Sequence, residues 1–173
     1  MLKLKDFEEI KKEIYKLEEL EPDKPSEWRI FCVVREIFDE NGQKIDEKCE
    51  VREFLLEIKE EKRKDRRIFE DIIAYFDRFY EIGPDPRLKF FRPIKGYKKQ
   101  EKQLQKLWET DDLYLCECKP IAQDLYRLIG CYSREKKFLV LVSGFKTPHG
   151  KKFRHECKRI IKILKRLKGG GLI

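Results

Sequence analysis

Leu125-Tyr126-Arg127-Leu128-Ile129-Gly130-Cys131-Tyr132 is followed, after the charged turn Ser133-Arg134-Glu135-Lys136, by Lys137-Phe138-Leu139-Val140-Leu141-Val142. Both runs are short and rich in β-branched and aromatic residues, which favours strands. They therefore predict two adjacent strands over residues 125–132 and 137–142. A third strand is expected over 113–119, before Pro120. Successive strand side chains face opposite sides, so Tyr126 should point into the core and Arg127 away from it.

The chain on the carboxyl side of this hairpin predicts a basic helix. After a loop over residues 143–150, apolar side chains recur at helical spacing over residues 151–168, while Lys and Arg occupy the other positions. The run Gly169-Gly170-Gly171 is typical of a helix end. A flexible tail over 169–173 follows.

The chain on the amino side predicts a strand and three helices. Residues 28–38 form an aromatic and β-branched run that ends at the turn Asp39-Glu40-Asn41-Gly42. Apolar residues at helical spacing predict helices over 49–63 and 66–80, joined as an antiparallel hairpin, and another over 4–20. The whole order indicates an α+β fold: a small antiparallel or mixed sheet packed by a helical hairpin and a C-terminal helix, with an extra N-terminal helix.

Charge is concentrated in two parts of the chain. The 173 residues carry a net charge of +8, but residues 134–173 hold thirteen Lys or Arg against two Glu, so the remaining 133 residues are at −3. A second basic cluster lies over 87–106. Such clustering is typical of a protein that binds a phosphate-rich partner on one side, and solvated helix faces are the alternative. The absence of a long apolar run or signal-like N-terminus predicts a cytoplasmic protein without membrane contact.

The six cysteines are expected to be reduced thiols, since no secretory signal accompanies them. High Lys and Glu with few Asn and Gln is a thermophilic composition, and intracellular disulfides occur in hyperthermophiles. A zinc site at Cys116, Cys118 and Cys131 is an alternative to buried thiols, but no Cys-x-x-Cys pair or nearby His supports it. No cofactor or metal is therefore expected.

The order of elements and three motifs resemble the RelE/HigB-like toxins of type II toxin–antitoxin modules, within the RelE/ParE superfamily. The motifs are Leu107-Trp108-Glu109 after Lys95-Gly96, Leu125-Tyr126-Arg127-Leu128-Ile129, and Gly144-Phe145-Lys146-Thr147-Pro148. The resemblance divides the chain into an N-terminal helical extension over 1–25, a toxin domain over 26–168 and the tail. It implies an mRNA endoribonuclease, or mRNA interferase, that acts without metal and in some relatives on the ribosome. It also implies a cognate antitoxin as partner.

Such a toxin cleaves RNA by attack of a 2′-OH on the adjacent phosphorus. The site must neutralise the phosphorane and move protons, for which Arg, Lys and His are suited. The resemblance assigns phosphate binding to Arg127 and transition-state stabilisation to Lys146, and His149 is the candidate proton shuttle. Candidate RNA-binding residues are Lys95, Lys98, Lys99, Lys151, Lys152 and Arg154.

Each assignment has a plainer alternative. Arg127 could form a salt bridge with Glu117 on the neighbouring strand. Lys146 and His149 could be ordinary exposed loop residues, and Lys95, Lys98 and Lys99 could keep a linker soluble. His155, inside the last helix, is a weaker proton-shuttle candidate.

Two other functions on the same fold remain open. Cys116-Glu117-Cys118 carries an acid and thiols where many relatives have an Arg, which motivates a non-catalytic binder of nucleic acid or of an acidic protein. A gyrase poison of the ParE type is the other. The expected N-terminal helix could cover the basic site as a lid or form a homodimer seam, and a helix that supports the sheet is the plainer alternative.

Overall fold

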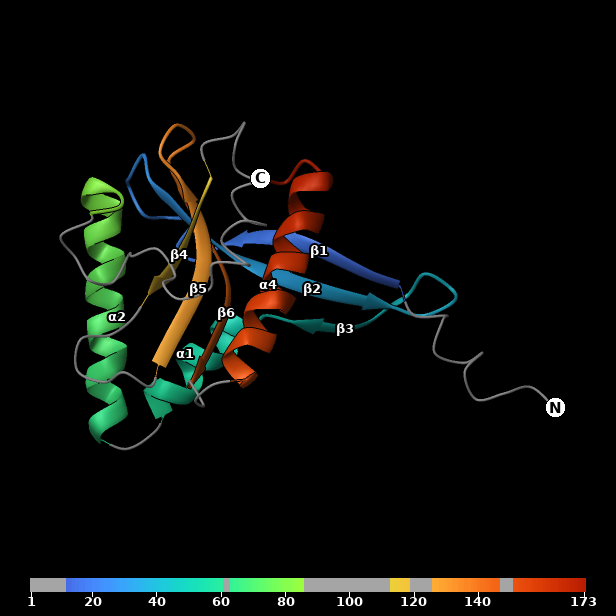
Figure 1. The fold of residues 1–173 in the computed structure, drawn as a ribbon, viewed down its shortest axis with the longest axis horizontal. Coiled ribbons are helices and arrows are strands. Elements are labelled where there is room, and N and C mark those ends of the chain that lie inside the picture. Colours follow the sequence, from blue (N-terminus) through green and yellow to red (C-terminus); the bar gives the residue numbers. More distant parts are fainter. Residues whose placement is uncertain (1–11, 61–62, 86–112, 119–125, 147–150) are drawn as a thin grey trace.

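The computed structural model describes residues 12–60, 63–85, 113–118, 126–146 and 151–173. They form an α+β fold with one mixed sheet of six strands and three helices (Figure 1). The strands are β1 (Lys12–Glu19), β2 (Arg29–Phe38), β3 (Lys44–Lys48), β4 (Tyr114–Cys118), β5 (Tyr126–Ser133) and β6 (Phe138–Lys146). The helices are α1 (Glu50–Glu60), α2 (Arg63–Ile82) and α4 (Lys151–Gly169).

The strand order is β1-β2-β6-β5-β4, with β3 paired to β2. β2 and β6 are parallel, whereas the other pairs are antiparallel. The parallel pairing joins Arg29 through Cys32 to Phe138 through Leu141 and then stops. Beyond that point β2 continues away from β6 with β1 and β3, and the three strands form an arm that extends from the body (Figure 1).

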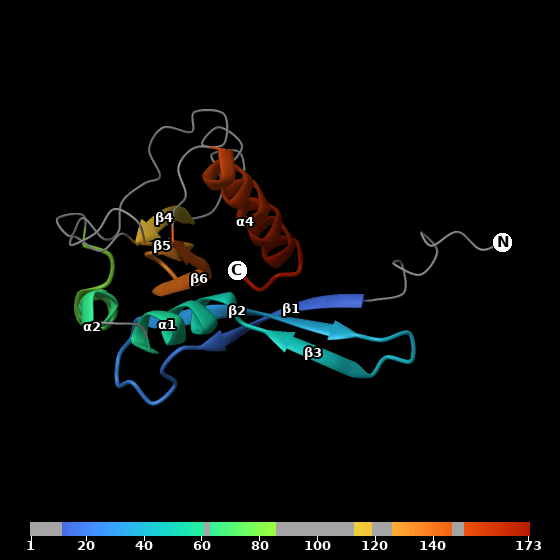
Figure 2. The same ribbon diagram turned by 90° about the horizontal axis from the view of Figure 1, so that it is seen from below.

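Two hydrophobic cores lie on opposite faces of the sheet. The first packs α1 and α2 against alternate residues of the strands, such as Leu128 and Leu141. The second packs α4 against the other set, such as Ile129 and Val140. Figure 2 shows α4 on one side of β5 and β6 and α1 on the other. Both faces of these strands are buried, which explains their nearly continuous apolar sequence.

The expectations for the central strands and the three described helices are confirmed. Strands 28–38, 113–119, 125–132 and 137–142 correspond to β2, β4, β5 and β6, and helices 49–63, 66–80 and 151–168 correspond to α1, α2 and α4. The loop expected over 143–150 is wrong for residues 143–146, because β6 continues to Lys146 in its pairing with β5. The turn at Asp39 is also present and leads into β3. Asp39 Oδ1 accepts hydrogen bonds from the N–H groups of Asn41 and Gln43, and Gly42 has a φ of 76° that favours glycine.

The expected N-terminal helix over 4–20 is wrong for residues 12–19, which form β1. Tyr15 and Leu17 pack on the second core, and Leu17 lies opposite Val33 of β2. Ile14, which helical spacing would bury, is 40% exposed. Pairing with β2 along all of β1 satisfies the backbone groups and outweighs the helical spacing, because propensity is a weak determinant beside tertiary contacts. Phe7 and Ile10 lie outside the described residues.

Candidate functional site

Arg127 and Lys146, the two catalytic candidates that the structure describes, lie at one end of the sheet. Here β5 begins and β6 ends, and the α4 backbone begins five residues after Lys146. The sheet register pairs Tyr126 with Lys146 and Arg127 with Phe145. The two catalytic candidates, Arg127 and Lys146, therefore belong to adjacent positions of neighbouring strands.

Arg127 and Lys146 nevertheless point to opposite faces of the sheet. Phe145, the partner of Arg127, packs on the α4 side. Tyr126, the partner of Lys146, is buried on the side of α1 and α2, as expected for a core tyrosine. Lys146 is exposed, and its Nζ lies 5.6 Å from the centre of the Tyr126 ring. A single phosphate held by Arg127 on the α4 side would thus not meet Lys146 in this arrangement.

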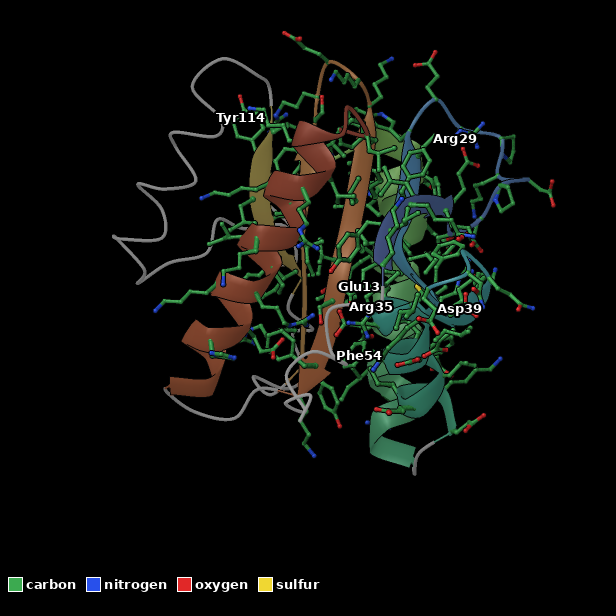
Figure 3. The ribbon with its side chains drawn as sticks, turned by 90° about the vertical axis from the view of Figure 1, so that its right-hand side faces the viewer. Glu13, Arg29, Arg35, Asp39, Phe54 and Tyr114 are labelled. Carbon is green, nitrogen blue, oxygen red and sulfur yellow. The ribbon has the colours of Figure 1, made fainter. Side chains whose placement is uncertain are left out.

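The end of the sheet is shaped by a close contact between α1 and β6. A Cβ on Gly144 would lie 2.4 Å from Cδ1 of Phe54, so a larger residue would displace this ring. Phe54 also approaches Tyr126, with ring centres 6.1 Å apart. Figure 3 labels Phe54 close to the end of the strands. Glycine at this position therefore lets α1 pack closely against β6.

Arg127 is held by an ion pair with Glu117, the alternative that the sequence left open. Arg127 Nε lies 3.4 Å from Glu117 Oε2, and Arg127 Nη1 lies 3.4 Å from the Tyr126 carbonyl oxygen. The Arg127 and Glu117 side chains are 14% and 9% exposed. Glu117 also raises the pKa of the Cys157 thiol on α4, after burial, which is the larger cause. The ion pair therefore lies between the sheet and α4, with a small opening to solvent.

A second charged cluster on the α4 side was not expected from sequence. Arg159 of α4 donates to Glu50 of α1 through Nη1 at 2.9 Å and to Glu156 through Nη2 at 2.8 Å. Its Nη2 also lies 3.3 Å from the hydroxyl of Ser143, on β6. Burial lowers the pKa of Arg159, but hydrogen bonds and charge from Glu50 and Glu156 raise it by more. The net effect is a raised pKa, so the guanidinium stays charged. Arg159 thus joins α4, α1 and β6 at one point.

Only part of this cluster had a signal in the sequence. Glu156 and Arg159 are three residues apart on a helix, a spacing that brings side chains together. Glu50 and Ser143 are brought to Arg159 by the fold, and no local pattern links them.

Several other candidate residues lie outside the part of the chain that the structure describes. This applies to His149, Lys95, Lys98 and Lys99. The backbone of Lys151, Lys152 and Arg154 forms the first turn of α4, but their side chains are outside the described part. His155 is exposed on α4.

The three cysteines considered for zinc do not converge. Cys116 and Cys118 lie in the core beneath α1 and α2, whereas Cys131 lies in the core beneath α4. Within the described ranges, no three His, Cys, Asp or Glu side chains are grouped to hold a metal ion. All six cysteines are free thiols.

The chemistry available at this end of the sheet is cationic and balanced by acids. Arg127 pairs with one carboxylate and Arg159 with two, so a phosphate could bind either guanidinium only by displacing or joining these partners. Arginine suits such an exchange because its planar donors fit carboxylate and phosphate alike.

Comparison with family models, curated proteins and solved structures gives no match for this chain. In the portion that the structure describes, every helix is too short or too polar to cross a bilayer.

Proposed function

We propose that this chain is an RNA-directed toxin of the RelE/HigB type, which binds an RNA phosphate at Arg127 on the α4 side of the sheet. The observation that carries the proposal is the position of Arg127: an oriented guanidinium at the sheet end where the basic first turn of α4 begins. The order on which the resemblance rests is strand, two helices, three strands and a helix, and the described chain has this order once β1 and β3 are set aside.

The charge around the start of α4 supports a polyanionic partner. A helix N-terminus carries partial positive charge and normally attracts acidic residues. The first turn of α4 has none and instead contains Lys151, Lys152 and Arg154. A basic sequence at a positive helix end is unfavourable by itself and becomes favourable when phosphate is bound nearby.

In this proposal, cleavage is metal-independent transesterification. Arg127 would neutralise the charge that develops on the phosphorane, and Glu117 would hold the guanidinium in position. His149 would transfer the proton, since imidazole titrates near neutral pH. Lys146 would contact the RNA backbone on the adjoining face instead of the same phosphate, because it points away from Arg127. The partners remain mRNA, the ribosome and an antitoxin.

A non-catalytic nucleic-acid binder is the second candidate function. It is favoured by the opposite orientations of Arg127 and Lys146, which separate two of the three expected catalytic groups. In this case the Arg127 end of the sheet would bind RNA without cutting it.

Cleavage of a defined mRNA, with and without ribosomes, separates these functions. The wild-type protein should cut in the presence of EDTA and leave 2′,3′-cyclic phosphate ends, and Arg127→Gln should lose the activity. Arg134→Gln is the matched control, because Arg134 is exposed at the opposite end of the hairpin. RNA that is bound but left intact in both formats would support the binder. DNA cleavage complexes on gyrase would support the ParE alternative.

A further inference from the structure

Two cysteine side chains from different elements meet at the start of α1. Cys32 lies on β2, where it is opposite Leu141 of β6, and Cys49 directly precedes α1. Both contact the core beneath α1 and α2. Lys48, which precedes Cys49, lies opposite Arg35 of β2 in the sheet register, so the fold brings Cys49 beside the part of β2 that holds Cys32. The two thiols are close enough for each to shift the pKa of the other, upward for Cys32 and downward for Cys49. The two sulfur atoms are therefore neighbours.

Cys49 is the N-cap residue of α1. Its carbonyl oxygen accepts a hydrogen bond from the Glu53 N–H at 3.1 Å. The backbone N–H groups of Val51 and Arg52, in the first turn of the helix, lower the pKa of the Cys49 thiol. These are donors that a helix N-terminus leaves without partners inside the helix, and they stabilise a thiolate more than a thiol.

The surroundings also favour charge on Cys49. The neighbouring Cys32 thiol, the backbone donors and the Arg52 guanidinium together lower the pKa of Cys49 to about 7. Arg52 is itself held by a contact with Glu18 of β1, and its Nη2 lies 3.2 Å from the Glu19 carbonyl oxygen. Burial and the contact with Cys49 raise the pKa of Cys32, so Cys32 keeps its proton.

Accessibility separates Cys49 from the other five cysteines, all of which lie in the described part of the chain. Cys49 is partly exposed, whereas Cys32, Cys116, Cys118 and Cys131 have no exposed surface and Cys157 is 4% exposed. Burial raises the pKa of Cys118, Cys131 and Cys157. Among the six, Cys49 therefore combines solvent access with a stabilised thiolate, the two properties of a reactive cysteine.

We propose that Cys49 and Cys32 form a redox-active dithiol, in which Cys49 reacts with a hydroperoxide and Cys32 closes a disulfide. The Cys49 thiolate attacks one oxygen of hydrogen peroxide, so that an S–O bond forms, the O–O bond breaks, and hydroxide leaves and takes up a proton as water. The Cys32 sulfur then attacks the Cys49 sulfur, an S–S bond forms and the S–O bond breaks. The second hydroxide accepts the Cys32 proton and also leaves as water. Two thiols lose two electrons, and one peroxide is reduced to two water molecules.

The disulfide would join Cys32 of β2 to Cys49, the residue directly before α1. The loop that it closes contains residues 33–48, which include the rest of β2, the turn at Asp39 and β3. Glu50, which follows Cys49, holds Arg159 of α4. Oxidation would therefore fix the point at which α1 meets α4. This inference does not depend on the proposed RNA activity.

Peptide mapping of the full-length protein after brief treatment with hydrogen peroxide tests the proposal. The wild type should lose two hydrogens in mass and yield one cross-linked peptide containing Cys32 and Cys49. In Cys32→Ala, Cys49 should remain as sulfenic acid, which dimedone traps. Cys49→Ser should form neither product, and serine is itself a favourable N-cap, so the helix start is retained.

Cys157→Ser is the matched control and should form the Cys32–Cys49 disulfide like the wild type. Alkylation by iodoacetamide gives a second measurement: Cys49 should react at least tenfold faster at pH 7 than any other cysteine of the folded protein. The proposal is overturned if Cys49 reacts no faster than Cys157, or if peroxide leaves Cys32 and Cys49 unlinked in the wild type.

Discussion

At the scale of single residues, the most consequential contact is the ion pair between Arg127 and Glu117. It is mostly buried, and a buried ion pair contributes little net stability because both charges lose hydration. Removing one partner is costly, since the other charge is left in the interior. The pair therefore fixes the position of Arg127 more than it stabilises the fold.

We expect Glu117→Gln to lower the free energy of unfolding by about 3 kcal/mol, because it leaves the Arg127 charge without its carboxylate. Chemical denaturation monitored by circular dichroism measures the free energy of unfolding of the variant and of the wild type. Glu135→Gln, in the exposed turn between β5 and β6, is the control and should change the free energy by less than about 0.5 kcal/mol. Equal stability of Glu117→Gln and the wild type would mean that the ion pair is not formed in solution.

The lowered pKa of the Cys49 thiol predicts how the stability of the protein changes with pH. This pKa is lowered from 9.0 to about 7 in the folded protein, first by the neighbouring Cys32 thiol. A lowered pKa means that the folded state releases the proton more readily, so stability from this group is present above the unfolded pKa and lost as pH falls through about 7. Over this window Cys32 stays protonated, because its own pKa is raised.

The free energy of unfolding of the wild type relative to Cys49→Ser should therefore increase between pH 6 and pH 9. Denaturation of both proteins under reducing conditions at several pH values measures the difference. A difference that is constant with pH would show that Cys49 titrates at its ordinary value.

At the scale of elements, comparison of the sheet's central strands, its arm and the helices shows which elements local sequence is sufficient to predict. β5 and β6 could be predicted because both their faces are buried and their sequence is apolar almost throughout. α1 and α4 could be predicted from helical spacing because each buries one face. β3 could not: it is charged and mostly exposed, and it exists because β2 extends beyond β6 and offers it an edge.

β1 illustrates the same limit more sharply. Lys16 of β1 lies 2.6 Å from Glu36 of β2, and Glu13 lies 3.6 Å from Arg35. Figure 3 labels Glu13 and Arg35 in the same region of the molecule. These pairs depend on the register with a strand some twenty residues away. The spacing of Ile14 and Leu17 alone fits a helix as well, so the sequence favoured the wrong element.

α4 should depend on Arg159 for its attachment to α1. Arg159→Gln removes charged hydrogen bonds to Glu50 and Glu156, and we expect a loss of about 2 kcal/mol in the free energy of unfolding. Hydrogen exchange of α4 amides should become faster, and denaturation should show the loss. Lys158→Ala, on the exposed side of the same turn, is the control. Unchanged exchange in Arg159→Gln would show that the second core alone holds α4.

At the scale of the whole molecule, the net charge of +8 says less about function than which basic side chains already form ion pairs. The last forty residues are at +11 and the rest of the chain at −3. Arg159 within those forty residues and Arg127 before them nevertheless already pair with carboxylates on the α4 side. The candidate site was predictable to the extent that the resemblance named Arg127 and the neighbouring predicted strand offered Glu117 as its alternative partner. That Lys146 and Arg127 point to opposite faces of the sheet depends on the register between β5 and β6. The cluster around Arg159 depends on contacts between segments that are distant in the chain. Spacing within the sequence encodes neither.

The most direct test of the account is the affinity for single-stranded RNA as a function of salt concentration, compared among wild type, Arg127→Gln, Glu117→Gln and Arg134→Gln. If Arg127 binds phosphate, Arg127→Gln should weaken binding and reduce the slope of log K against log salt by about 0.7, the value for one phosphate contact on a single strand. Glu117→Gln should strengthen binding, because the competing carboxylate is gone, and Arg134→Gln should match the wild type. Identical affinities and slopes for the wild type and Arg127→Gln would contradict the assignment of the RNA site to this end of the sheet.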